Sequence, residues 1–475
     1  FVVISVNLYL TRGHYISVDN FGNNEARHMR KRLEGLVDND DKMRLINEQV
    51  ESRNVDERLP FVISMYAFEE EFKGIKPYIA NFLENMNEPA KKIMFALSLA
   101  DYGNVSIDSQ FFAEMFNEDD IDSFLLEDSP CIYELVRQEE VSGKNVLRVR
   151  YHLFGEEILR QMSNGRDATE ISFIELLDYI INFIDDSRNN KYVVNQHTIN
   201  LLRSLFITRI ADLNAQKPAF SPLIEKLREE SSKASDMYDT SNDAIVRIFN
   251  KLVEKYPEEP HFAAHLARYY FYIDKNYEKG FANINSSIEL SEVVNGRVDP
   301  LLYHMKAMGY SSYVINKLKK DILLEFRNDP SYDIRNSVEV IEENANNASS
   351  YFQIVRESNI GVAAHVSEIN LCVEIANLAK TIVEESADFN QYLTTDDGRW
   401  AVKYVDRAET LWEECKQLAS ESAYEDLDGI EERVKTLASS LEDSIIVWED
   451  YISKAPNTNC TQARRILARS YEKKS

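Results

Sequence analysis

The stretch from Pro260 to Leu290 reads PHFAAHLARYYFYIDKNYEKGFANINSSIEL, and its apolar residues recur at helical spacing in two successive runs. In the first run the positions that share one helix face are Leu266, Ala267 and Tyr270. In the second run they are Tyr277, Gly280, Phe281 and Ile284. Small residues between large ones let a paired helix approach closely, so the stretch predicts a helical hairpin.

The large–small–aromatic order of the first run is similar to the first helix of a tetratricopeptide repeat. The second run matches the second helix of such a repeat with about one residue of slippage. Pro257 and Pro260 precede the hairpin, where a previous repeat would end. The chain around it reads as helix after helix, so we predict an α-solenoid of tetratricopeptide-like repeats over residues 171–475, with the register left open.

Residues 87–165 have a different pattern. A helix is predicted from Asn87, with Pro89 just inside it, and two short helices follow. The segments IYELVRQEEV and VLRVRY, joined by SGKN, then predict a β-hairpin. Three helices and a hairpin are the order of a winged helix. Its third helix, EDDIDSFLLED, is acidic, whereas DNA-reading helices carry Arg and Lys, so groove binding is disfavoured.

The first residues, FVVISVNLYLTRG, form a continuous β-branched and apolar run. Such a run is typical of a strand buried on both faces of a parallel α/β sheet, whose partner strands we expect before Phe1. The predicted fold is therefore mainly α, with four domains along the chain. They are the end of an α/β domain at 1–40, a small helical domain at 41–86, the winged helix at 87–165, and the solenoid at 171–475.

The composition excludes some functions. Lys and Arg total 54 against 80 Asp and Glu, a formal charge of −26. So acidic a surface repels phosphate backbones, so we expect no binding to nucleic acid or to anionic membranes. No run approaches the length of a membrane span. The cysteines lie far apart and form no CxxC pair, which fits a reducing cytoplasm; they are Cys131, Cys372, Cys415 and Cys460.

No phosphate loop, dinucleotide fingerprint, zinc-protease motif or nucleophile elbow occurs in the sequence, so no catalytic residue is predicted. His261 and His265 have the spacing of metal ligands on a helix, but no third ligand is near, so we interpret them as packing residues and expect no metal. Tyr269 and Tyr270 have two interpretations, as packing between helices or as part of a surface that binds a protein partner.

Three further residues are candidates for phosphate contact. Arg12 follows the buried strand, where open sheets bind ligands, although an exposed loop arginine is an equal alternative. Pro60, in ERLPF, also fits a simple helix break. His152 lies between the VLRVRY strand and the next helix. A helix N-terminus disfavours a protonated ring unless an anion is also present, but a neutral imidazole can still donate to a phosphate.

Taken in order, these segments resemble the back half of a STAND-type nucleotide-binding switch, the class of plant NLR resistance proteins, apoptosome proteins and bacterial antiviral sensors. Arg12 in LYLTRG occupies the place of the family's sensor arginine. ERLPF is similar to its GLP-like motif, whose proline borders the nucleotide, with Arg58 in place of the glycine. VRYHLFGEEIL resembles its MHD-like motif, with His152 as the histidine and Leu153 in place of the aspartate.

The resemblance implies a cytoplasmic signalling switch in antiviral or immune defence. The full-length protein would bind ATP or ADP through Walker motifs before Phe1, and His152 would latch the winged helix to the nucleotide. The solenoid, with Tyr269 and Tyr270, would sense a protein ligand such as a viral protein, and activation would produce a homo-oligomer. The alternatives are a helical-repeat interaction scaffold without a nucleotide role and a winged-helix transcription regulator, which the acidic third helix disfavours. Whether the parent protein is an enzyme stays open.

Overall fold

The computed structural model describes most of the chain in two compact units, which are treated separately here. Unit 1 comprises residues 1–209 and 219–244, and unit 2 comprises residues 210–218 and 245–475. The residues described are 9–10, 14–15, 22–37, 39–52, 58–68, 72–116, 132–141, 143–165, 171, 173–188, 196–209, 220–233, 240–329, 332–358, 361–383, 389–418, 429–437, 441–454, 464, 467–468 and 471.

The predicted N-terminal strand lies largely outside the described residues. Its described end, β1 (Tyr9–Leu10), pairs antiparallel with β2 (His14–Tyr15) in a two-stranded sheet. Tyr9 is opposite Tyr15 and Leu10 is opposite His14. The described residues of this segment therefore form a short hairpin, which differs from the expected pairing in a parallel sheet.

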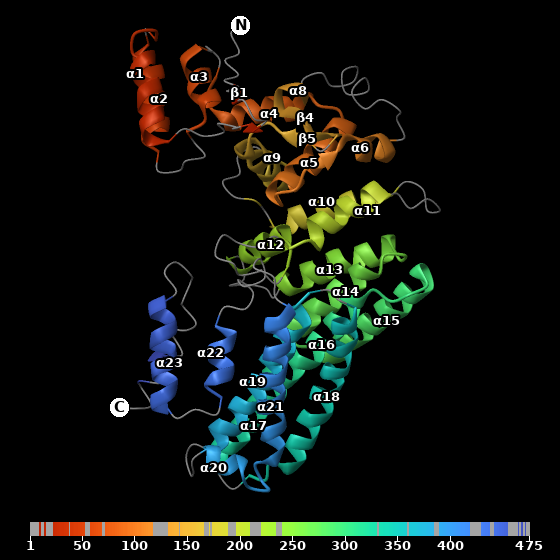
Figure 1. Ribbon diagram of the computed structural model, residues 1–475. Coiled ribbons are helices and arrows are strands. Elements are labelled where there is room, and N and C mark those ends of the chain that lie inside the picture. The colour runs from red at the N-terminus through yellow and green to blue at the C-terminus, as the bar shows by residue number, and fades with distance from the viewer. Residues whose placement is uncertain are drawn as a thin grey trace. The chain divides into compact units, whose positions relative to one another are not determined.

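Four helices follow in unit 1 (Figure 1), and the first three share one apolar core, against which Ile75 of the fourth also packs. They are α1 (Asn23–Leu33), α2 (Asp40–Glu51), α3 (Pro60–Phe68) and α4 (Ile75–Asn85). The start of α2 is set by Asn39, whose side chain accepts hydrogen bonds from the backbone N–H groups of Asp41 and Lys42. Ile46 and Ile63 are fully buried between these helices.

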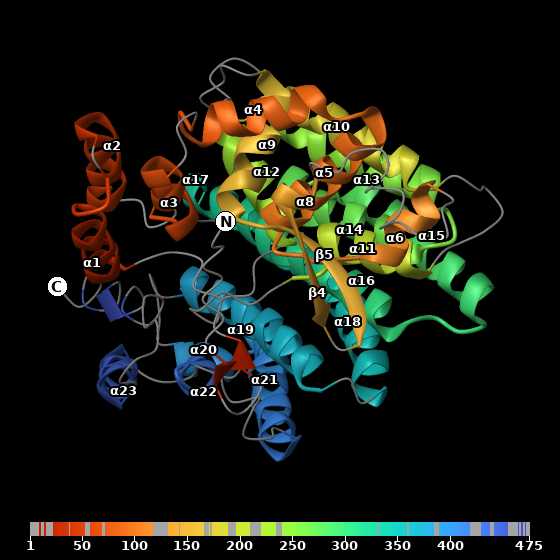
Figure 2. The same ribbon diagram turned by 90° about the horizontal axis from the view of Figure 1, so that it is seen from above.

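The next elements form a winged helix. They are α5 (Glu88–Tyr102), β3 (Ile107–Asp108), α6 (Ser109–Phe116), α8 (Ile132–Leu135), β4 (Val136–Val141), β5 (Lys144–Val149) and α9 (His152–Asn164). The sheet order is β3-β5-β4, all antiparallel, and Figure 2 shows the β4–β5 hairpin. The hairpin prediction is confirmed, except that IYEL forms a helical turn before the strand begins. The acidic third helix lies outside the described residues.

Three more helices complete unit 1: α10 (Phe173–Asp186), α11 (Gln196–Phe206) and α12 (Pro222–Lys233). By their contacts they belong with the winged helix, whereas the sequence placed the start of the solenoid at residue 171. The four domain boundaries stay predictions, because a division by contacts into two units does not test them.

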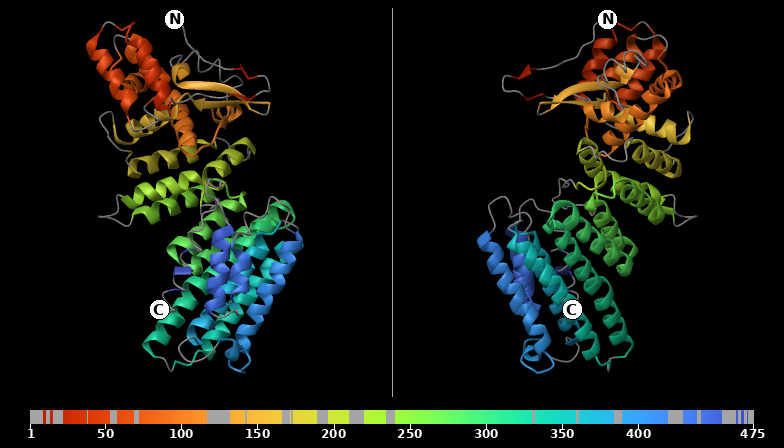
Figure 3. Two further views of the ribbon diagram at one scale, coloured as in Figure 1. Left: turned by 60° about the vertical axis from the view of Figure 1, so that its left-hand side comes forward. Right: turned by 90° about the vertical axis from the view of Figure 1, so that its right-hand side faces the viewer.

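Unit 2 is built of helices in the part that the structure describes, which confirms the mainly α class. They are α13 (Thr240–Lys255), α14 (Pro260–Tyr269), η2 (Tyr270–Asp274), α15 (Tyr277–Asn295), α16 (Pro300–Tyr313), η3 (Val314–Leu318), α17 (Lys319–Asn328), α18 (Arg335–Glu357), α19 (Ala363–Val383), α20 (Phe389–Leu393), α21 (Arg399–Leu418), α22 (Ile430–Lys435) and α23 (Leu441–Lys454). Figure 3 shows the long helices of this unit running beside one another, and α16 packs on α18 as α19 packs on α21.

The hairpin predicted over residues 260–290 is present as α14 and α15. Its centre is Phe271, which is fully buried. A Cβ atom added to Gly280 of α15 would lie 2.4 Å from the Phe271 ring, and one added to Gly309 of α16 would lie 2.5 Å from it. The two glycines therefore form a notch that admits this ring between three successive helices.

A buried ionic cluster links α18, α19 and α21. Glu368 of α19 has a side chain with no exposed surface and accepts hydrogen bonds from Arg356 and Arg407. The Arg407 Nε atom lies 3.0 Å from Glu368 Oε1. Two guanidinium groups thus satisfy both oxygens of a carboxylate inside the helical stack.

Candidate functional site

His152 is the first residue of α9, and it faces a carboxylate. Its Nδ1 atom lies 2.6 Å from Oδ2 of Asp101. The side chain of His152 is 45% exposed and that of Asp101 is 25% exposed. A protonated ring at a helix N-terminus is disfavoured unless an anion is near. In this structure the chain itself supplies that anion, the Asp101 carboxylate.

Asp101 lies in the last turn of α5, where the helix dipole disfavours an acid unless cations are near. Two cationic groups are present: His152 and Lys226 of α12. The Lys226 Nζ atom donates to the backbone carbonyl of Tyr102 at 2.7 Å and lies 4.2 Å from the centre of the Tyr102 ring. Gly155 of α9 keeps this corner open, because a Cβ there would lie 3.0 Å from the Asp101 carboxylate.

The hydrogen bond that His152 donates to the Asp101 carboxylate raises the pKa of His152, against the opposing effects of burial and of Lys226. Burial lowers the pKa of Lys226, although Asp101 and Glu156 act in the opposite direction. The C-terminus of α5, the N-terminus of α9 and the middle of α12 therefore form one polar cluster, which we call the His152 corner: Asp101, His152, Glu156 and Lys226.

The raised pKa predicts a pH dependence. Since the pKa of His152 in the folded state exceeds the value of about 6.5 of an unfolded histidine, its pairing with Asp101 stabilises the fold fully below about pH 6.5. That contribution is lost as the pH rises through the folded-state pKa. Because the ring is 45% exposed, we expect it to be below about 1 kcal/mol.

The direct measurement is an NMR titration of the His152 ring in the wild type and in Asp101→Asn. The substitution replaces the charged acceptor with a neutral amide, which no longer favours the protonated ring, so the pKa of His152 should fall to or below the unfolded value. The ring of His28, exposed on α1, is the internal control. An unchanged His152 titration would show that Asp101 does not set its charge.

Pro60 lies in the same part of unit 1 as His152. It is the first residue of α3, and the ring of the next residue, Phe61, lies 5.3 Å from that of Tyr151 and 5.6 Å from that of Phe154. The residue after Pro60 therefore packs against the residue before His152 and against Phe154, two residues after it. Arg58, two residues before Pro60, is 5% exposed and donates a hydrogen bond to Asn23.

The other predicted residues are Arg12, Tyr269 and Tyr270. Arg12 lies outside the described residues. Tyr269 and Tyr270 are 1% and 7% exposed, which favours packing between helices among the two interpretations that the sequence left open. Both rings pack between helices, because the helix pairs of this hairpin approach closely there. Their contact with a partner stays an untested prediction that would require this packing to change.

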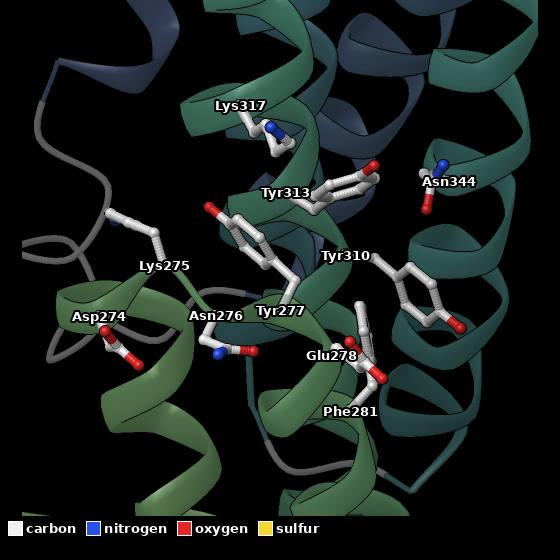
Figure 4. Close-up of a pocket in the computed structure, with 10 residues that line it drawn as sticks. All are labelled: Asp274, Lys275, Asn276, Tyr277, Glu278, Phe281, Tyr310, Tyr313, Lys317 and Asn344. Atoms are coloured by element: carbon white, nitrogen blue, oxygen red, sulfur yellow. The ribbon is translucent and has the colours of Figure 1, made fainter.

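Unit 2 has a groove that the sequence did not predict. Its volume is about 720 Å³, and it is open to solvent (Figure 4). It is formed by the end of η2, the start of α15, the junction of α16 with η3, and α18. The lining residues are Asp274, Lys275, Asn276, Tyr277, Glu278, Phe281, Tyr310, Tyr313, Lys317 and Asn344.

One wall of the groove is aromatic. The rings of Phe281 and Tyr310 are 4.4 Å apart, and those of Tyr277 and Tyr313 are 4.9 Å apart. Behind them the ring of Tyr351 lies nearly parallel to Tyr310, at 8° and 6.2 Å. The Tyr277 hydroxyl donates to the Ser312 carbonyl at 3.1 Å. These contacts hold the wall in a fixed arrangement.

The lysines around the groove have interaction partners, whereas two of its carboxylates form no ion pair with the residues that the structure describes. Lys317 pairs with Asp321 at 3.5 Å, and Lys275 lies 3.4 Å from the Phe271 carbonyl. Within the described part of the chain, by contrast, the exposed carboxylates of Asp274 and Glu278 form no ion pair. The groove thus presents free negative charge beside aromatic rings.

Both π-helical segments border the groove. Segment η2 ends at Asp274, and the next residue, Lys275, has a φ of +58°, in the left-handed region. Segment η3 contributes Lys317. Such turns interrupt regular helix packing and often occur at functional sites.

Two other kinds of chemistry find no support in the described residues. These residues include no group of three His, Cys, Asp or Glu side chains placed to hold a metal ion. His261 instead pairs with Asp299 at 3.2 Å. Burial raises the pKa of the Cys372 thiol to about 12 and that of Cys415 to about 11, so neither is a ready nucleophile. No described helix has both the length and the apolar character needed to cross a membrane.

Comparison with known proteins gives one similarity of note. No protein-family profile and no curated protein matches the chain. Among solved structures, the chain is similar to a signal transduction ATPase with numerous domains (STAND) from Pyrococcus horikoshii, whose sensor is a tetratricopeptide repeat. The match covers 97% of this chain and 71% of that one, with 13% identity and a TM-score of 0.21. Such a score is below that of a shared fold, so the proposals below rest on this chain's own residues.

Sequence reasoning missed three features of these sites: Asp101, Lys226 and the groove. Asp101 had a usable signal, since an acid in the last turn of a helix opposes the dipole and requires a cationic partner. Lys226 had no such signal, because it lies 125 residues after Asp101 in the sequence and only the packing of α12 brings it to the His152 corner. The groove also had no sequence signal, as its lining comes from four elements whose packing the repeat pattern alone does not specify.

Proposed function

We propose that this chain is the switch and sensor part of a nucleotide-regulated signalling ATPase of the STAND kind. The phosphate-binding loop would lie outside this sequence, which contains none. Unit 1 would hold ADP in the resting state, and the helical hairpins of unit 2 would detect a protein ligand, such as a viral protein. Ligand binding would release the switch and lead to homo-oligomers in the cytoplasm.

The observation that carries the proposal is the placement of His152. It begins the helix that follows the winged-helix hairpin, it is half exposed, and it faces an anion. Pro60 lies nearby through its neighbour Phe61. A ring that already binds one anion can exchange it for another. We infer that His152 alternates between the Asp101 carboxylate and a nucleotide phosphate.

This exchange predicts opposite effects for two substitutions in the protein that carries the phosphate-binding loop. His152→Ala removes the donor to phosphate, so ADP should dissociate faster. One charge-assisted hydrogen bond is worth about 1.5–3 kcal/mol, and we expect a change of about tenfold or more. Asp101→Asn removes both a competitor for the ring and a repelling charge, so ADP should dissociate more slowly.

The measurement is the dissociation rate of a fluorescent ADP analogue, with His28→Ala on α1 as the matched control that should leave the rate unchanged. If both corner substitutions speed dissociation equally, they act through the fold and the exchange does not occur. If no variant retains nucleotide and the wild type does not either, the interaction scaffold without a nucleotide role becomes the better description.

A further inference from the structure

We propose that the groove at η2 and η3 binds an arginine side chain presented by an extended segment of the partner protein. This inference deepens the proposed sensor role, because it names the place and the chemistry of recognition. The groove has three properties that together select this occupant: an aromatic wall, free carboxylates, and lysines that are already engaged.

The wall fits a planar cation. A guanidinium group stacks on the faces of tyrosine and phenylalanine rings, and Phe281, Tyr310 and Tyr313 line the groove. Cations already lie over rings in this unit, since Lys306 Nζ lies 4.5 Å from the centre of the Tyr351 ring directly behind the wall. The space of about 720 Å³ is ample for one long side chain and the adjoining backbone.

The charges favour arginine over an anion. In Figure 4 the two lysines lie at one end of the groove, and Glu278, Phe281 and Tyr310 lie at the other. Glu278 is free of ion pairs in the described structure, and the negative charge of Glu343 also acts on Tyr310, whose pKa is raised by burial first, then by Tyr351 and Glu343. A guanidinium group at the Tyr310 end of the groove would lie on the side of Glu278 and away from Lys275 and Lys317.

The charge of the whole chain supports the same occupant. With a formal charge of −26, the protein attracts basic segments over a distance of about one Debye length before any contact forms. A general attraction, however, acts on every basic group alike. The groove adds selection, because only a cation that is also planar gains from the aromatic wall.

The test uses N-acetyl-arginine methylamide and its citrulline counterpart, which has the same shape without the charge, as probes in saturation-transfer NMR with the 475-residue chain. We expect the arginine probe to bind at millimolar concentration and at least about tenfold more tightly than the citrulline probe. Tyr310→Ala and Glu278→Gln should each weaken arginine binding about tenfold. Glu278 is exposed, so its substitution leaves the fold intact.

Glu289→Gln is the matched control, because Glu289 is exposed on the same helix α15 but lies away from the groove. It should leave binding unchanged. The proposal is overturned if the two probes bind equally, if the arginine probe does not bind, or if Glu289→Gln weakens binding as much as Glu278→Gln. The measurement needs no nucleotide, so its outcome is independent of the ADP experiments on His152.

Discussion

Replacing Phe271 with alanine should lower the free energy of unfolding of unit 2 by about 3–5 kcal/mol. The ring is fully buried, fits the notch of Gly280 and Gly309, and lies 5.1 Å from the Phe281 ring. Its removal leaves a cavity that α14, α15 and α16 all border, and neither glycine has a side chain to fill it. Urea unfolding combined with hydrogen exchange of peptides from these helices measures the loss.

The notch also predicts a compensation between substitutions. Gly280→Ala alone should destabilise by about 1–3 kcal/mol, because the new methyl group would overlap a ring that cannot move. In a Phe271→Ala background the same change should be neutral or stabilising, since the cavity receives the methyl group and alanine favours the helix by about 1 kcal/mol. Val293→Ala, at 82% exposure on α15, is the control and should change stability by less than about 0.5 kcal/mol. If the losses of stability from Phe271→Ala and Gly280→Ala simply add in the double variant, the Phe271 ring does not occupy the space next to Gly280.

Replacing Glu368 with glutamine should destabilise unit 2 by about 3 kcal/mol, at the lower end of the range for breaking a buried ion pair. The substitution leaves Arg356, whose side chain is only 11% exposed, without a charged partner inside the helical stack. Arg407, at 37%, can turn toward water, which limits the loss. Urea unfolding of the variant at two salt concentrations gives both the size of the effect and its origin.

Salt distinguishes this buried cluster from surface charge pairs. Screening acts strongly on exposed charges and weakly on buried ones, so the effect of Glu368→Gln should persist at high salt. The control is Asp396→Asn, which removes an ion pair with Arg399 whose side chains are 91% and 81% exposed. It should change stability by less than about 0.5 kcal/mol. If high salt abolishes the effect of Glu368→Gln, the cluster is not shielded as the structure indicates.

The sequence predicted the helical class and the hairpin at 260–290 because both depend on local periodicity. It also predicted the strand-to-helix joint at His152, where the period changes from two to about 3.6 within a few residues. It did not predict the pairing of His152 with Asp101, which lies 51 residues away, since such a contact depends on how α5 and α9 pack. The exposure of Tyr269 and Tyr270 was equally beyond reach, because neighbouring aromatic residues on a helix give no indication of which faces a third helix covers.

The slippage of about one residue between the two helices of the repeat pattern has a structural origin. Segment η2 follows α14 without a break, and a π-helical turn takes up about one residue more than an α-helical turn. The spacing of a tetratricopeptide repeat therefore fits each helix by itself, but it is shifted by about one residue between α14 and α15. A repeat pattern with a fixed spacing therefore aligns the residues of the second helix one position away from their true counterparts.

Segment η3 lies within the continuous helix from Pro300 to Asn328, and it too takes up about one extra residue. It therefore changes the side of the helix that each later residue faces. One added residue turns the next helix face by about 100° relative to the preceding one. The helix can therefore present Tyr310 to the groove and, one phase shift later, direct Lys319 of α17 to Glu374 at 2.7 Å. A single helix thus serves two neighbours on different sides, and a regular α-helix over the same residues would turn Lys319 about 100° away from Glu374.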